Sequence, residues 1–230
     1  MSDPAPTPLL VSRPLLLGWC AWLLGCWVVN LVAYSPQRSW VMEVDGLMHW
    51  RVPGELFIPV ARGMMVSVGL SLGLIWPVWR LSLSEVQGVG RIVSDGATLW
   101  LVTQVIVWPL RVLVDLSLTD LLSISFTLMA VTVLGGACIA IGRRGTGGAW
   151  RAAGAILCAM VLLGPWVAAY VTGRNSLARL TPLGSLWSLS GGIHGDGSAM
   201  WQGFGRPLLL IAASLTAGAI FRAPHTQPPQ

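Results

Sequence analysis

The stretch that decides the fold is Val105 to Leu118, V-I-V-W-P-L-R-V-L-V-D-L-S-L, which belongs to an apolar run of membrane-spanning length. It carries Arg111 and Asp115, four residues apart. Residues at this spacing lie on one face of a helix, where opposite charges can neutralise each other. An unpaired charge at the bilayer centre costs about 2.5–3.5 kcal/mol on insertion scales. The stretch therefore predicts either a polar path inside a helical bundle or a charged pair at the membrane surface.

The composition of the whole chain is that of a membrane protein. Of its 230 residues, 54% are apolar and 10% are charged, and the mean hydropathy is +0.71. Soluble domains contain about 25% charged residues. Several apolar runs reach the length of about 18 residues that a helix needs to cross the hydrocarbon core. The sequence predicts an all-α, polytopic membrane protein and excludes a soluble globule.

The apolar runs predict about six transmembrane helices in a single domain, residues 14–222, with polar, Pro-rich ends at 1–13 and 223–230 that we expect to be disordered. The last run is short for a span and would need either to include Phe204 and Gly205 or to thin the bilayer locally. Ser117 and Asp120 have capping-box spacing and should begin the fourth span. The expected spans are residues 15–34, 57–79, 97–114, 121–142, 149–172 and 205–221.

A short amphipathic helix is expected between the first two spans. In Ser39 to Arg51, the apolar residues Trp40, Val41, Val44, Leu47 and Met48 recur at helical spacing. A helix with one apolar and one polar face lies in the membrane interface.

The arginines predict the orientation, because cytoplasmic loops carry an excess of positive charge. With both termini in the cytoplasm, the cytoplasmic segments hold seven arginines and the opposite side holds five. The turn at Arg143 and Arg144 would then face inward. We expect a multi-pass protein of the inner, cytoplasmic membrane with both ends cytoplasmic.

The chain is rich in tryptophan, with 13 such residues. Indole rings prefer the membrane interface, where the ring is buried and the N–H stays wet. A Trp-Pro pair followed by an arginine occurs at 76–80 and again at 108–111. The recurrence is explained by convergence, because these residues are common at the ends of membrane helices. An inverted repeat of the kind found in transporters is the alternative. The expected interface anchors are Trp76, Trp79, Trp108 and Arg80.

The second span carries small residues in two rows, which predict close contact with other helices. Lipid gives no hydrophobic drive for helix association, so small residues four apart mark interfaces where backbones approach closely. The first row is Gly63, Ser67 and Ser71, and the second is Gly69 and Gly73.

Four polar residues are candidates for a path through the bundle: Arg111, Asp115, Gln104 about two turns deeper, and Asn30 of the first span. The alternative is that Arg111 snorkels to the interface and that Asp115 already belongs to the turn. The direction of the Arg111 side chain separates the two interpretations.

No cofactor is expected, and no catalytic motif supports an enzyme. His194, Asp196 and His49 offer imidazole and carboxylate groups on one side of the membrane, but their spacing matches no metal-binding motif. The four cysteines also lack paired spacing. The segment before Cys26 resembles the cleavage site of bacterial lipoproteins, but the apolar run continues beyond it, which favours a spanning helix.

Two functions remain open for such a chain. The first is a permease-like or transport-associated subunit, in which Arg111, Asp115 and Gln104 should face the bundle interior. The second is a non-catalytic membrane scaffold or assembly subunit of a larger complex, in which these groups pair locally and the small-residue rows bind helices. The expected partners are the lipid bilayer and other membrane protein subunits, and the scattered charges argue against nucleic acid.

Overall fold

The structure, a computed structural model, describes residues 13–34, 41–44, 47–50, 53–83, 89–143, 148–173, 181–190, 207 and 209–214. Among these residues, five helices are long and apolar enough to cross a membrane, which confirms the helical membrane class. Of the expected sixth span, 205–221, only Pro207 and residues 209–214 are described, and they are helical. The two terminal tails lie outside the described residues, apart from Arg13. The five candidate spans are Pro14–Ala33, Phe57–Ser82, Val89–Val114, Leu118–Gly142 and Gly148–Thr172.

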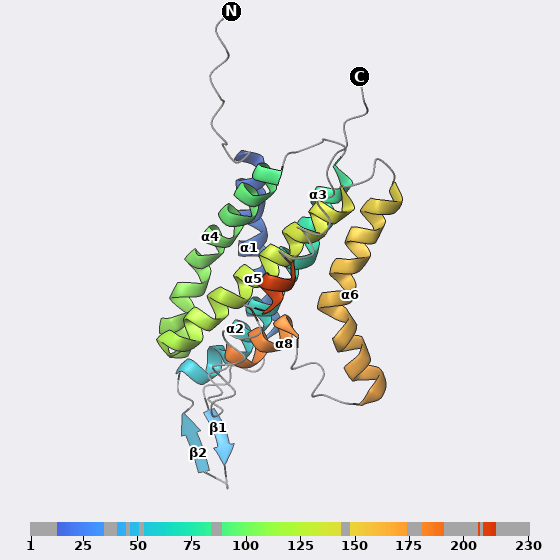
Figure 1. Ribbon diagram of the computed structural model, residues 1–230. Helices are drawn as coiled ribbons and strands as arrows, with labels where there is room; N and C mark the ends of the chain where they lie inside the picture. Colours follow the sequence, from blue (N-terminus) through green and yellow to red (C-terminus); the bar gives the residue numbers. More distant parts are fainter. Residues whose placement is uncertain are drawn as a thin grey trace, which may run out of the picture.

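The candidate spans run alternately up and down the bundle (Figure 1). The second is built from α2, a π-helical segment η2 and α3, and a shorter helix, α8, follows the fifth. The helix α4 begins at Val89, eight residues before the start expected at residue 97, so part of the expected connector is helical. The bounds are α1 Arg13–Ala33, α2 Pro53–Leu70, η2 Ser71–Ile75, α3 Trp76–Ser82, α4 Val89–Val114, α5 Leu118–Gly142, α6 Gly148–Thr172 and α8 Pro182–Leu189.

The expected interfacial helix at 39–51 is wrong, because two short strands lie there. Strands β1 (Val41–Val44) and β2 (Leu47–Trp50) pair antiparallel, with Val44 opposite Leu47. The two residues between the strands are Asp45 and Gly46 in the sequence. An Asp-Gly pair between short apolar segments is a strong hairpin signal. This local signal outweighs the helical spacing of the apolar residues.

Helix α5 is the centre of the bundle. It packs against α3, η2, α4, α6 and α8, and Figure 1 shows it between α4 and α6. In its most apolar stretch 67% of the residues are buried, against 28% for α1 and α4 and 22% for α6. The outer helices therefore present broad apolar faces, as expected where lipid surrounds a bundle.

Glycines set how closely the helices approach α5. A Cβ added at Gly154 of α6 would lie 2.7 Å from the carbonyl oxygen of Cys138, and one added at Gly135 would lie 2.9 Å from the carbonyl oxygen of Leu72. Both distances are too short for a side chain, so these backbones lie in direct contact. Cys138 and Gly142 on α5, and Gly154 and Cys158 on α6, form two small-residue pairs at the four-residue spacing typical of membrane helix interfaces.

The second half of the turn between α4 and α5 forms as the sequence predicts. The Ser117 side chain accepts a hydrogen bond from the backbone N–H of Asp120 at 3.1 Å, so Ser117 caps α5. Asp115, which directly follows α4, has a φ of +53°. This left-handed conformation reverses the chain direction, and a short polar residue tolerates it better than a bulky one.

Candidate functional site

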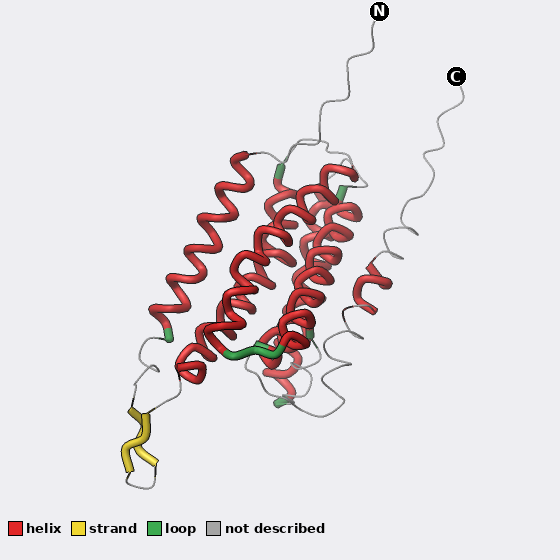
Figure 2. Tube along the Cα trace, turned by 90° about the vertical axis from the view of Figure 1, so that its left-hand side faces the viewer, coloured by secondary structure: helices red, strands yellow, loops and turns green. Residues whose placement is uncertain are grey.

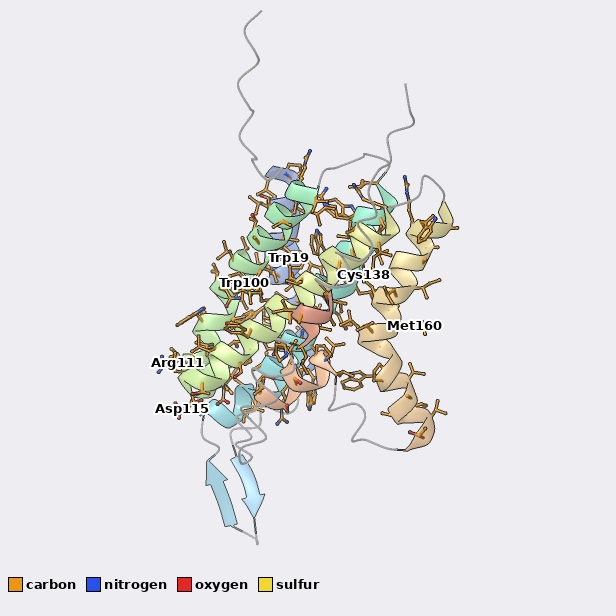
Figure 3. All side chains as sticks on the ribbon, viewed as in Figure 1. Trp19, Trp100, Arg111, Asp115, Cys138 and Met160 are labelled. Carbon is orange, nitrogen blue, oxygen red and sulfur yellow. The ribbon has the colours of Figure 1, made fainter. Side chains whose placement is uncertain are left out.

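The polar-path candidates at the end of α4 lie on the outside of the bundle. Arg111 and Asp115 are both exposed, and Figure 3 shows them at the edge of one end. No ion pair joins them in the described part of the chain, where the Arg–Asp salt bridge is made by Arg80 and Asp95. The two side chains do not share a helix face, because the backbone of Asp115 has left the helical conformation.

The other two candidates each pair with a neighbouring helix. The Ser125 hydroxyl of α5 donates to Oε1 of Gln104 at 2.8 Å. Asn30 donates from Nδ2 to the Cys26 carbonyl at 2.8 Å and to the Ser67 hydroxyl at 3.3 Å. Gln104 therefore lies between α4 and α5, and Asn30 lies between α1 and α2. The structure does not bring the four candidates together.

The two small-residue rows of the second span meet several helices. A Cβ added at Gly63 would collide with Asn30 of α1, and Ser71 accepts a hydrogen bond from the Trp22 indole of α1 at 2.6 Å. A Cβ at Gly69 would lie 2.7 Å from Leu186 of α8. A Cβ at Gly73 would lie 2.6 Å from both Val131 of α5 and Leu162 of α6.

Two of the four expected interface anchors are buried instead. Trp76 and Arg80 are each 3% exposed, whereas Trp79 and Trp108 are exposed. The Trp76 ring lies between two glycines, because Cβ atoms added at Gly96 of α4 and Gly135 of α5 would lie 3.0 and 3.4 Å from it. Trp76 therefore fills space between three helices, and the exposed Trp79 and Trp108 stay anchor candidates.

Arg80 and Asp95 form a buried salt bridge between α3 and α4. The Arg80 guanidinium also lies 5.2 Å from the centre of the Trp79 ring. Arg143, which follows α5, donates from its guanidinium to the Arg80 carbonyl at 2.8 Å. The cluster thus joins the ends of α3, α4 and α5 on one side of the bundle. Removal of either partner of a buried ion pair leaves the other charge uncompensated. Both residues are therefore needed for the pair to hold these helices together.

The sequence interpretation missed this pair because it placed Asp95 in a solvated connector. The signal that would have found it is the helical period of α4. The buried positions Ile92, Leu99, Val107 and Val114 continue one stripe. Extended to the start of α4, the same stripe contains Asp95. An aspartate on a buried stripe requires a cationic partner, and the nearest arginine before it on a packed helix is Arg80.

A cavity of about 310 Å³ lies between α5, α8 and the helical segment 209–214. Its described lining is mostly apolar, with the hydroxyl-bearing residues Thr127 and Ser185. Figure 2 shows segment 209–214 on the outer side of the bundle. The lining residues are Thr127, Ala130, Pro182, Ser185, Pro207, Leu209 and Leu210.

Helix α8 is held in place by its neighbours. The Thr181 hydroxyl accepts from the backbone N–H of Gly184 at 2.9 Å and from the Trp166 indole of α6 at 3.0 Å. On the other side, the Arg62 guanidinium of α2 lies 5.6 Å from the centre of the Trp187 ring. Helix α8 is largely buried against α2 and α5.

His194 and Asp196 lie outside the described residues, and His49 lies on β2, of which only the backbone is described. Within the described part, no three His, Cys, Asp or Glu side chains are grouped as a metal site would require.

Comparison with known proteins identifies no relative. No protein-family model, no curated protein and no solved structure matches this chain.

Proposed function

We propose that this chain is a non-catalytic scaffold or assembly subunit of a larger membrane complex. The observation that carries the proposal is how the polar side chains of the described bundle are used. Three cross-helix contacts, Asn30–Ser67, Gln104–Ser125 and Arg80–Asp95, each join a different pair of helices. Polar groups that serve as links between helices stabilise a fixed arrangement.

A polar path would need a different arrangement. Residues that line a route for a polar solute face one shared space and leave hydrogen-bonding capacity for the solute. Here Gln104 and Asn30 bond to neighbouring helices, and Arg111 and Asp115 are exposed at one end. The contacts of Gln104 and Asn30 support the local pairing expected for a scaffold, whereas Arg111 and Asp115 do not pair with each other.

The outer face of α1 supports association with another helix. Gly18 and Gly25 have no atom within 4 Å of an added Cβ, and the exposed Leu17, Leu24 and Val28 lie beside them. Small residues flanked by apolar ones allow close approach of a second membrane helix. The partner of this face is, in this proposal, a transmembrane helix of another subunit.

Photo-crosslinking in native membranes tests the proposal. A photoreactive amino acid replaces Leu24, which is 65% exposed, or its inward neighbour Leu23, which is 2% exposed. We expect a discrete adduct with another membrane protein from position 24 and none from position 23. Lipid adducts alone at position 24, together with purification of the chain free of partners in mild detergent, would overturn the scaffold function.

A permease-like subunit is the second candidate, and α8 favours it. The helix has eight residues, about 12 Å at 1.5 Å per residue, too short to cross a core of about 30 Å. It is nevertheless buried in the bundle beside a cavity. Short, interrupted helices at membrane depth form binding sites in transporters.

Gln104→Cys separates the two candidates. Labelling of this position in native membranes by a charged, water-soluble maleimide would show a water-filled route and favour the permease. Protection, with Arg111→Cys labelled in parallel, favours the scaffold.

A further inference from the structure

We infer that the cavity between α5, α8 and segment 209–214 binds a small, neutral, lipid-soluble molecule that carries one hydroxyl or carbonyl group. The inference holds whether the chain acts as a scaffold or as a permease, because it rests on the cavity alone.

The depth of the cavity decides which compartment supplies the ligand. Thr127 is nine residues beyond the start of α5 at Leu118, roughly 14 Å along the helix at 1.5 Å per residue. This is close to the middle of a hydrocarbon core of about 30 Å. Leu209, which lines the cavity, is also exposed on the outside of the bundle. The cavity therefore opens sideways at a depth where lipid, not water, surrounds the protein.

The size and lining limit the ligand further. An apolar cavity of about 150 Å³ holds benzene, so a cavity of 310 Å³ admits a molecule of about twice that size. None of its described lining residues is charged. A charged ligand would lose its hydration without gaining a counter-ion, and this excludes ionic ligands from the proposal.

Ser185 supplies the polar recognition. The residue is 2% exposed and lines the cavity, and its described hydrogen bonds, from its N–H to Thr181 and to its carbonyl from Ser188, are made by its backbone. Thr127, across the cavity, donates its own hydroxyl proton to the Ser123 carbonyl at 2.8 Å. Its oxygen can therefore only accept a further hydrogen bond. A ligand oxygen that accepts a hydrogen bond from the Ser185 hydroxyl would gain an interaction that the apolar part of the lining does not offer.

Photolabelling of the purified full chain in lipid nanodiscs tests this inference. The probe is a diazirine analogue of 1-octanol, and the labelled residues are located by mass spectrometry. We expect adducts near Thr127, Ser185 and Leu210, which excess 1-octanol suppresses. Adducts spread over the outer faces of α1, α4 and α6, or insensitive to 1-octanol, would overturn the inference.

Two variants of α8 provide the matched comparison. Ser185→Ala removes the hydroxyl in the cavity and should weaken labelling about fivefold, the effect of one lost neutral hydrogen bond. Ser188→Ala makes the same chemical change on the same helix, but Ser188 does not line the cavity, so labelling should not change. Equal labelling of both variants would show that Ser185 does not recognise the ligand and would overturn the inference.

A hydrocarbon probe distinguishes the proposed ligand from a lipid tail. A diazirine analogue of decane has no oxygen, so it should label the cavity more weakly than the octanol probe and without dependence on Ser185. If decane competes as well as 1-octanol, the cavity holds plain acyl chains and the proposed ligand class is wrong. Leu210→Trp, at the cavity rim, should suppress labelling by both probes in a protein that elutes normally on gel filtration.

Discussion

The two ends of α4 each carry an aspartate with an arginine near it, and the two pairs behave in opposite ways. At the start of α4, Asp95 meets Arg80 of α3, and both are buried. At its end, Asp115 and Arg111 are four residues apart in sequence, yet both are exposed. The pair that is close in sequence does not form, and the pair brought together by helix packing does. Burial, not spacing, makes charge pairing obligatory in a membrane bundle.

The largest expected effect follows from removing one partner of the buried pair. Asp95→Ala leaves the Arg80 guanidinium buried without its carboxylate and should lower the free energy of unfolding by about 3–5 kcal/mol. The midpoint of unfolding in detergent of increasing denaturing strength measures this change. Asp115→Ala is the matched control at the other end of α4.

The double variant Arg80→Met/Asp95→Leu sharpens the same test. Replacing both charges with apolar side chains of similar volume is often neutral or stabilising, so this protein should recover most of the stability that Asp95→Ala loses. A double variant as unstable as the single one would show that the salt bridge contributes more than mutual neutralisation.

A smaller effect is expected from separating the helices that carry the pair. Gly96→Leu would displace the Trp76 ring and push α3 away from α4, at a cost of about 1–3 kcal/mol of unfolding free energy. Gly90→Leu, also on α4, meets no atom within 4 Å of the added Cβ and gains the same helix propensity. Equal stability of the two variants would contradict the role of Trp76 as a spacer.

At the exposed end of α4 the backbone matters more than the charge. Asp115 has a φ of +53°, a conformation that glycine adopts without steric cost. Asp115→Gly should therefore raise the unfolding free energy by up to about 1 kcal/mol, and Asp115→Val should lower it. Thermal unfolding followed by circular dichroism gives the sign of each change. The same sign for both variants would mean that the turn conformation differs from the one described.

The smallest effect is expected for Arg111. The side chain is exposed, and surface substitutions usually change stability by less than about 0.5 kcal/mol. Arg111→Gln should have the same midpoint of unfolding as the unmodified protein in the same detergent titration. A loss as large as that of Asp95→Ala would show that Arg111 pairs with another charge and that the two ends of α4 are equivalent.

Apolar run length predicted the architecture, and the residues explain where it failed. Spans within α1, α5 and α6 follow from hydropathy, because the bilayer sets helix length directly. The Ser117 cap follows from a local hydrogen bond. The hairpin at β1 and β2 was missed because the apolar spacing fits a helix while Asp45-Gly46 favours a turn. For such a short segment, both patterns should be weighed.

The site was harder to predict because it depends on contacts between distant segments. Trp76 and Arg80 have the composition of interface anchors, and only the packing of α3 against α4 and α5 shows that they are buried. Ser185 gives no signal in the sequence, because the cavity it lines exists only once α8 folds back against α5. Local patterns specify elements, whereas these sites arise from the arrangement of elements.

The π-helical segment η2 determines which way α3 faces. An α-helix turns by about 100° per residue, and a π-helical turn holds one more residue than an α-helical one. Pro77, which has no N–H to donate, lies two residues beyond the end of η2. If Ser71–Ile75 formed a regular α-helix of the same length, the extra residue would rotate α3 by about 100° relative to α2. Arg80 would then leave Asp95 although no charged residue had changed, so the register of an uncharged segment one turn away controls the electrostatics of this end of the bundle.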